Sequence, residues 1–127
     1  MMTEPHTLLA SMLDGYVARD AGAMGAVLAE DVRVWVTNAE GGVDPLQGRE
    51  LVIGALLSLE APVFHIEVTQ MVRVSDVQAL AMVEIRAERN GKSLHNFSSF
   101  LARTEADRIA ELWMVEALPA YSAEFWS

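Results

Sequence analysis

The chain has 127 residues, a mass of 13.9 kDa and a formal net charge of −9 from 9 basic and 18 acidic side chains. That length fits one domain, residues 1–127, whose core needs neither disulfides nor metal. The acidic surplus repels phosphate backbones and so argues against nucleic-acid binding. Cysteine is absent, which excludes disulfides, cysteine-based zinc sites and cysteine catalysis.

Nothing in the sequence predicts export or insertion into a membrane. The apolar stretch at residues 8–13 ends at Asp14, so it is too short for the core of a signal peptide. No apolar run reaches the length of a membrane span. We therefore expect a cytoplasmic protein.

Helical spacing of apolar residues dominates the first half of the chain. It predicts helices at residues 9–17, 20–28 and 48–59, with a short strand at 33–37 and a mobile loop at 38–47. Asp20 is a suitable N-cap for the second helix, and Pro62 stops the third.

Strand patterns dominate the second half. They predict four long strands at residues 63–74, 77–89, 93–103 and 108–116, with a last helical turn in the tail. Asn90-Gly91 is a strong signal for a two-residue hairpin turn. Helices followed by a hairpin meander predict an α+β fold, with three N-terminal helices on a strongly curved, mainly antiparallel sheet. Helices on the concave side of such a sheet would form a cone, and its interior would be an apolar pocket for a small molecule.

Six short motifs follow one another along the chain: Ala29-Glu30-Asp31-Val32, Gly48-Arg49-Glu50, Ile66-Glu67-Val68-Thr69-Gln70, Asp107-Arg108-Ile109, Glu111-Leu112-Trp113 and Glu124-Phe125-Trp126. In this order and spacing they resemble the nuclear transport factor 2-like superfamily, and in particular its SnoaL-like and ketosteroid isomerase-like branch. The resemblance covers about residues 8–126. It implies the cone fold, but that fold carries many activities and some proteins without one.

The resemblance also implies where catalytic groups of known relatives would fall. The tyrosine of the ketosteroid isomerases would lie near Met12, one turn before Tyr16, while their two aspartate positions fall on Val36 and Ser99. The proton-transferring base of those isomerases is therefore missing here.

Two other activities of the superfamily are tested in the same way. The histidine position of the SnoaL-like cyclases falls on Leu112, and their acidic residue falls about one position after Glu116. The Asp-Arg-Asp cluster of limonene-epoxide hydrolases has no equivalent on one predicted face.

Alternation along the strands predicts which side chains face the pocket. The expected lining is Met12, Tyr16, Val36, Ile66, Val83, Ile85, Phe97, Ser99, Leu112, Met114 and Glu116. His95 would face inward with Phe97 and Ser99. The opposite sheet face carries large apolar residues among polar ones, and dimers formed through that face are common in the superfamily, so a homodimer is expected.

Three side chains are the catalytic candidates: Glu116, Tyr16 and His95. A carboxylate beside an apolar cavity has a raised pKa and can act as an acid or base, whereas at an open strand end it is simply solvated. Tyr16 could donate to a ligand carbonyl or only pack in the core, and His95 could be a base or an exposed strand residue.

The sequence thus predicts a cofactor-free protein that binds a small apolar molecule. It could catalyse an isomerisation, cyclisation or dehydration, or it could be a non-catalytic ligand-binding or dimeric module. No metal is expected, because the three histidines lack paired ligand spacing.

Overall fold

The computed structural model describes residues 3–127. Its helices are α1 (Pro5–Val17), α2 (Ala21–Val27), α3 (Arg49–Leu57) and α4 (Pro119–Trp126). Its strands are β1 (Leu28–Thr37), β2 (Val43–Gln47), β3 (Val63–Arg73), β4 (Gln78–Arg89), β5 (Lys92–Glu105) and β6 (Arg108–Glu116). The predicted α+β class is confirmed.

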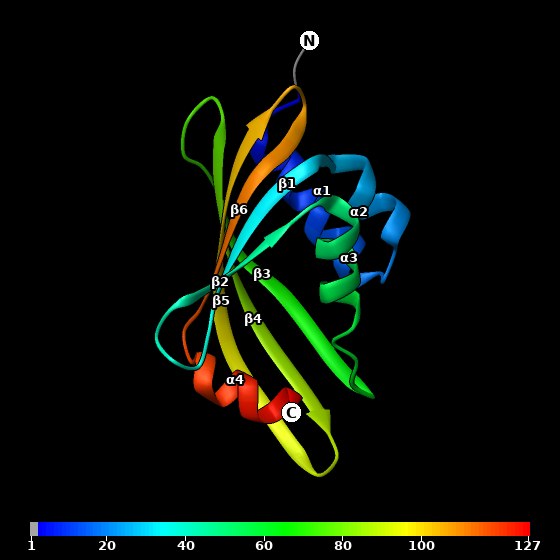
Figure 1. Ribbon diagram of the computed structural model, residues 1–127, viewed down its shortest axis with the longest axis vertical. Helices are drawn as coiled ribbons and strands as arrows, with labels where there is room; N and C mark the ends of the chain where they lie inside the picture. Colours follow the sequence, from blue (N-terminus) through cyan, green and yellow to red (C-terminus); the bar gives the residue numbers. More distant parts are fainter. Residues whose placement is uncertain (1–2) are drawn as a thin grey trace.

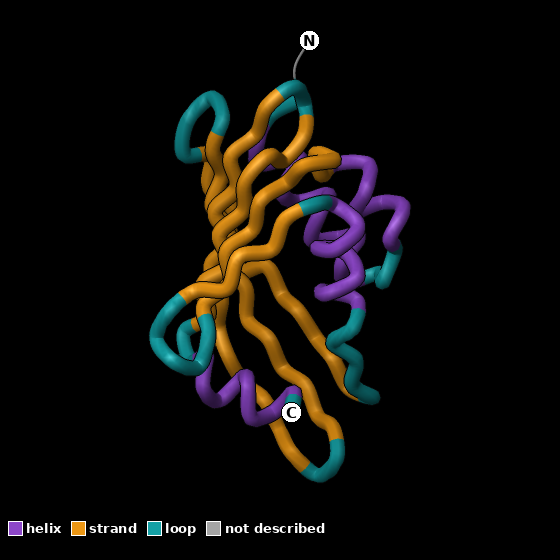
Figure 2. The backbone as a smooth tube through the Cα atoms, viewed as in Figure 1, coloured by secondary structure: helices purple, strands orange, loops and turns teal. Residues whose placement is uncertain are grey.

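The six strands form one mixed sheet in the order β2-β1-β6-β5-β4-β3. Neighbouring strands are antiparallel except β1 and β6, which run parallel. The three N-terminal helices gather beside one half of the sheet, whereas α4 lies across the other half (Figure 1). The strands diverge at the end near α4 (Figure 2).

Two segments differ from their sequence-based predictions. The expected loop at residues 38–47 contains the edge strand β2, in which Pro45 lies opposite Trp35. An edge strand tolerates proline because one of its sides pairs with no other strand. The first strand begins at Leu28 rather than at residue 33. A register shift between Leu28 and Arg33 interrupts the alternation of inward and outward side chains, so the sequence pattern of this part does not indicate a strand.

The core forms between α1 and the inner face of the sheet. The predicted stripe on α1 is confirmed, since Leu9, Met12 and Leu13 are almost fully buried against residues of the strands. Burying each such side chain stabilises the fold by about 1.5–3 kcal/mol. Tyr16 continues this stripe at the end of α1, where the packing becomes looser.

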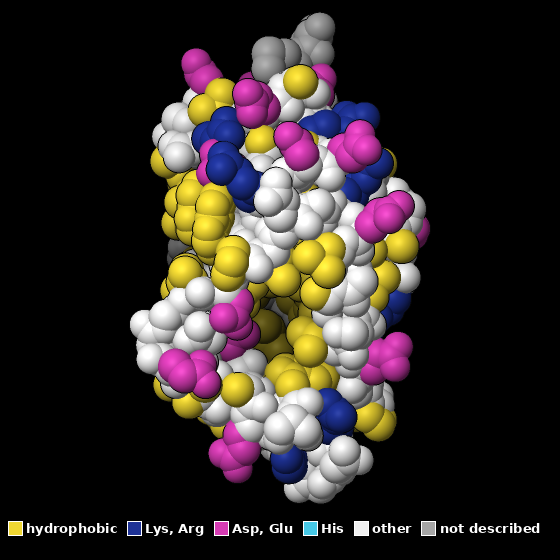
Figure 3. All heavy atoms as spheres, in the orientation of Figure 1, with side chains coloured by type: hydrophobic (Ala, Val, Ile, Leu, Met, Phe, Trp, Pro, Cys, Tyr) yellow, Lys and Arg dark blue, Asp and Glu magenta, His cyan; other side chains and the backbone are white. Residues whose placement is uncertain are grey.

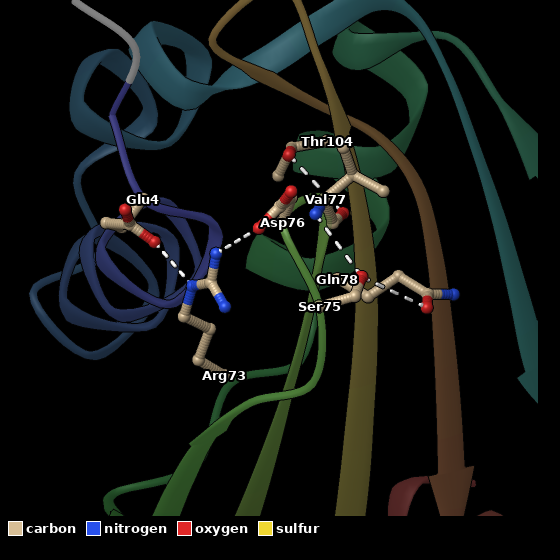
Figure 4. Close-up of polar contacts among 7 residues, drawn as sticks. All are labelled: Glu4, Arg73, Ser75, Asp76, Val77, Gln78 and Thr104. Carbon is tan, nitrogen blue, oxygen red and sulfur yellow. Dashed lines mark hydrogen bonds and ion pairs between the residues drawn. The ribbon is translucent and has the colours of Figure 1, made fainter.

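Polar contacts hold the start of α1 to the turn between β3 and β4 (Figure 4). Arg73 Nε donates to Glu4 Oε2 at 2.7 Å, and Arg73 also pairs with Asp76, which together raise the pKa of Arg73. The carbonyl of Val77 accepts from the backbone N–H and hydroxyl of Thr104. These contacts fix the end of the fold that lies away from α4. No helix within residues 3–127 is long and apolar enough to cross a membrane.

Candidate functional site

The facing of β5 follows from its hairpin with β4. Asn90 and Gly91 have φ values of 52° and 74°, as a tight two-residue turn requires, so Arg89 lies opposite Lys92. Continuing this register places Val83 opposite Ser98. Directly opposed residues share a sheet face, so the inward side chains of β5 are those at even positions. They are Leu94, Asn96, Ser98, Phe100, Ala102 and Thr104.

The prediction that His95, Phe97 and Ser99 face the pocket is therefore wrong. His95 is exposed on the outer face, where its Nε2 lies 3.2 Å from Glu84 Oε1. Phe97 is 42% exposed, and the Ser99 hydroxyl donates to the sulfur of Met82. The family-based placement of Ser99 had set the whole strand one residue out of phase, which reverses every side chain.

A bulge in β6 turns Glu116 toward the interior. Thr104 pairs with Ile109 but Arg103 pairs with Glu111, so one residue of β6 is left without a partner in β5. Beyond this bulge the even positions face inward, and Glu116 lies opposite Ser98. The Thr37 hydroxyl accepts from the Glu116 backbone N–H at 3.0 Å. The end of β6 is thus fixed from both sides.

Two neighbouring spaces open between the helices and the sheet. An outer cleft of about 580 Å³ is lined by Tyr16, Val17, Arg19, Glu60, Ala61, Pro62, Phe64 and Ile66. An inner cavity of about 50 Å³ is lined by Tyr16, Leu56, Leu59, Phe64, Ile85, Leu94, Asn96, Ser98, Phe100, Met114, Glu116, Ser122 and Trp126. Figure 3 shows the hollow, with hydrophobic side chains inside it and acidic ones at its edge.

Tyr16 and Phe64 line both spaces and therefore separate them. Their rings meet edge to face, with centroids 6.2 Å apart. Phe64 also packs against Trp126 of α4, at 5.3 Å. The two rings thus form the wall that the outer cleft and the inner cavity share.

Only part of the expected pocket lining borders these spaces. Tyr16, Ile66, Ile85, Met114 and Glu116 line one or both of them. Met12, Val83 and Leu112 are packed in the closed core instead, and Val36 packs against that core. The helices fill this end of the fold more completely than strand alternation alone can indicate.

The carboxylate of Glu116 is the most unusual group of the inner cavity. Within residues 3–127, its buried Oε2 has no hydrogen-bond partner. Burial raises the pKa of Glu116, and a hydrogen bond from Ser122 opposes this effect only in part. A carboxyl group in this state holds its proton to higher pH and can act as both acid and base.

Tyr16 adds a second ionisable group to the same cavity. Burial raises its pKa to about 12, while Arg19 lowers it and the charge of Glu116 raises it further. Tyr16 therefore stays protonated at neutral pH and keeps an O–H that can donate to a ligand oxygen. Its position between the two spaces places this donor where a ligand would pass.

Asn96 attaches α4 to the sheet and so closes the cavity. Its Nδ2 donates to the carbonyl of Leu118 at 3.2 Å, and its Oδ1 accepts from the N–H groups of Phe97 and Leu118. Leu118 precedes the first turn of α4, whose Ser122 and Trp126 line the cavity. Asn96 is itself almost fully buried.

Sequence reasoning missed Asn96, Ser98, Ser122 and Arg19 as residues of the site. The two on β5 could have been found, because a two-residue turn at Asn90-Gly91 fixes the register from Arg89 onward. Ser122 lies within α4 and Arg19 follows the end of α1, and the direction of both helices depends on tertiary packing. In the part of the chain that the structure describes, no group of three or more His, Cys, Asp or Glu side chains could hold a metal ion.

Comparisons with known proteins identify the fold. No family model and no curated protein matches the sequence. Among solved structures, an NTF2-like protein from Burkholderia thailandensis is 14% identical, with a TM-score of 0.82 over 99% of each chain. A protein from Jannaschia assigned as a SnoaL-like polyketide cyclase is 11% identical, with a TM-score of 0.77 over 95% of this chain and 90% of that one.

An LEH-like epoxide hydrolase from M. tuberculosis is 12% identical, with a TM-score of 0.75 over 98% of this chain and 90% of that one. Together these neighbours show that the chain has the NTF2-like fold, which confirms the resemblance noted in the sequence. At such low identity they define the fold and not the activity.

Proposed function

We propose that the protein binds a small, largely apolar molecule in the outer cleft and acts on it as a cofactor-free acid–base catalyst. The observation that carries this proposal is the buried, unpartnered Oε2 of Glu116 in the inner cavity of about 50 Å³, which shares Tyr16 and Phe64 with the cleft of about 580 Å³. Ligand sites of small molecules occupy roughly 300–1,000 Å³ and combine apolar walls with a few polar groups.

The chemistry best supported is proton transfer next to a carbonyl group. Glu116 in its ionised form would remove a proton from the carbon beside the carbonyl, and the Tyr16 O–H would donate to the oxygen that gains negative charge. The same carboxyl group would then return the proton to another carbon, which completes an isomerisation. Cyclisation and dehydration use the same two roles.

A non-catalytic binding module is the alternative. It is favoured by the sequence, which lacks the catalytic aspartates of the isomerases at Val36 and Ser99. Both alternatives need ligand binding, and only the catalytic one needs Glu116 to change its protonation state.

A thermal-shift screen of small ketones, lactones, phenols and sterols tests the shared part of the proposal. A ligand at about one hundred times its dissociation constant stabilises the fold by about 2.7 kcal/mol, a readily measured rise in Tm. Replacing Ile66 in the cleft by Lys should abolish the shift, whereas Val43→Lys on the distant edge strand should not. A broad panel without hits would contradict a small-molecule site.

A second copy of the chain is the proposed partner. Exposed apolar residues gather on the outer sheet face, among them Phe97 at 42% and Val115 at 48% exposure, beside the stacked rings of Trp35 and Trp113. The charges on this face are already compensated in pairs such as Arg103–Glu111 and Arg86–Glu84, so two copies would meet without strong repulsion.

Light scattering at a series of protein concentrations tests this partner. We expect a dimer for the parent chain and a monomer for Val115→Lys, because the interface would then have to bury an unpaired ammonium group. A parent chain that stays monomeric at high concentration would contradict it.

A further inference from the structure

We propose that the cleft selects amphipathic anions, with the apolar body of the ligand against Phe64 and its carboxylate or similar head group on the guanidinium of Arg19. This inference rests on the proposed ligand site and names the chemical class that the site takes. It is carried by the backbone at Arg19, by the charges around the cleft and by the sizes of the two spaces.

Arg19 occupies a backbone position that normally belongs to glycine. At the end of α1 the N–H of Arg19 donates to Tyr16 O at 3.1 Å, and that of Asp20 donates to Gly15 O at 2.8 Å. These bonds form the common helix-ending motif whose left-handed residue is usually glycine. Arg19 adopts it with a φ of 58°, a conformation that costs a residue with a Cβ about 1–2 kcal/mol.

This strained conformation directs the Arg19 side chain to the cleft. One of its terminal nitrogens donates to the carbonyl of Leu57 at the end of α3, which fixes the guanidinium between the two helices. Arginine has five N–H donors, so most of them stay available at this position. The nearest carboxylate, Glu60, lies 3.9 Å away on a side chain that is 81% exposed, and such pairs contribute little.

Arg19 is the sole cation among the described residues that line either space. The chain as a whole carries a net charge of −9, so this single guanidinium stands out against a negative surface. Arginine binds carboxylates and similar oxyanions in a planar, two-point geometry. A neutral apolar ligand would gain nothing from a fixed guanidinium at the rim.

The sizes of the two spaces set the orientation of the ligand. The inner cavity, at about 50 Å³, has room for a small group and not for a ring, whereas the outer cleft has room for a ring system. A small polar group of the ligand would therefore reach Glu116 past Tyr16. Its ring would stay against Phe64 and its anionic head would stay at Arg19.

Two fluorescent probes with the same ring system test this selection. One is 8-anilinonaphthalene-1-sulfonate, and the other is N-phenyl-1-naphthylamine, which lacks the sulfonate. Titrating both into the parent and into Arg19→Gly gives the ratio of their affinities. In the variant we expect the affinity for the sulfonate probe to fall about tenfold relative to that for the neutral probe, because a charge-assisted hydrogen bond is lost.

Arg19→Gly is suited to the test because glycine accepts the left-handed backbone without strain. The relief offsets the lost bond to Leu57, so the Tm should stay within about 3 °C of the parent. Arg19→Lys keeps the charge and should change the ratio less than glycine does. Arg108→Ser removes one charge at the start of β6, away from the cleft, and controls for the net charge.

The outcomes separate the two levels of the proposal. A ratio that changes in Arg19→Gly and not in Arg108→Ser supports the anion site. If both probes bind and the ratio is equal in the parent and in Arg19→Gly, the anion site is overturned, whereas the cleft is still supported as a ligand site. Failure of both probes to bind the parent overturns the anion site together with the proposed ligand site.

Discussion

Glu116→Gln should lower turnover of any substrate identified in the ligand screen by about 10²–10³-fold, the usual contribution of a general acid–base group. Glutamine has nearly the same shape but cannot take up a proton from the ligand. The binding of unreactive ligands should survive, so the loss should be in kcat with KM little changed. Steady-state kinetics with purified parent and variant protein provides the measurement.

The same substitution should stabilise the fold at neutral pH. Because burial raises the pKa of Glu116, the folded chain holds this proton more tightly than the unfolded chain does. The stability of the parent therefore falls as the pH rises from the unfolded pKa of about 4.5 through the higher folded value. Above that window the parent carries a poorly solvated charge, which glutamine lacks.

We thus expect Glu116→Gln and the parent to have similar Tm values near pH 4, and the variant to melt about 3 °C higher near pH 7. Glu88→Gln, at an exposed position of β4, removes the same formal charge and should show no such pH dependence. Unchanged turnover in Glu116→Gln would show that Glu116 is not the catalytic group, whereas ligands that bind the parent without any turnover would favour the non-catalytic module. An unchanged difference in Tm across the pH range would show that Glu116 is well solvated.

The sequence was sufficient for the fold because its strongest signals are local. The stripe on α1 and the Asn90-Gly91 turn each depend on a few neighbouring residues, and both occur as predicted. The edge strand β2 was missed because Gly41, Gly42 and Pro45 resemble a loop, and its pairing with β1 is a tertiary contact.

The candidate site was less accessible to sequence reasoning because it depends on strand phase. Glu116 and Tyr16 were found, but the facing of Glu116 requires the bulge in β6, which no local pattern indicates. His95 and Ser99 were placed inward from a family position, although the hairpin register required Ser98 to face inward opposite Val83. A register counted from a tight turn was in this case the better guide.

Asn96→Ala should destabilise the fold by about 3 kcal/mol. The substitution removes three hydrogen bonds of a side chain that is only 1% exposed, and it leaves the partly buried N–H and carbonyl of Leu118 without these partners, each at a cost of about 1–3 kcal/mol where water does not replace Asn96. A domain of this size is stable by about 5–15 kcal/mol, so the variant should still fold. Urea denaturation with matched slopes gives the difference.

Tyr121→Phe is the matched comparison, since it also removes a side-chain contact between α4 and β5, but one that does not border the inner cavity. The Tyr121 hydroxyl donates to Ser93 O at 2.7 Å and accepts from the His95 N–H at 3.2 Å, and the residue is 37% exposed, so water can replace the hydroxyl and its loss should cost about 1 kcal/mol or less. Equal costs for the two variants would show that Asn96 is replaceable by water.

The loss of Asn96 should also reach the chemistry of the cavity. When α4 loosens, water reaches Glu116, the burial that raises its pKa is reduced, and the acid limb of the pH–rate profile moves to lower pH. Tyr121→Phe should leave that limb in place. A shift confined to Asn96→Ala would tie the proton affinity of Glu116 to the closure of the cavity by α4, whereas equal profiles would mean that this carboxyl group is shielded by the sheet alone.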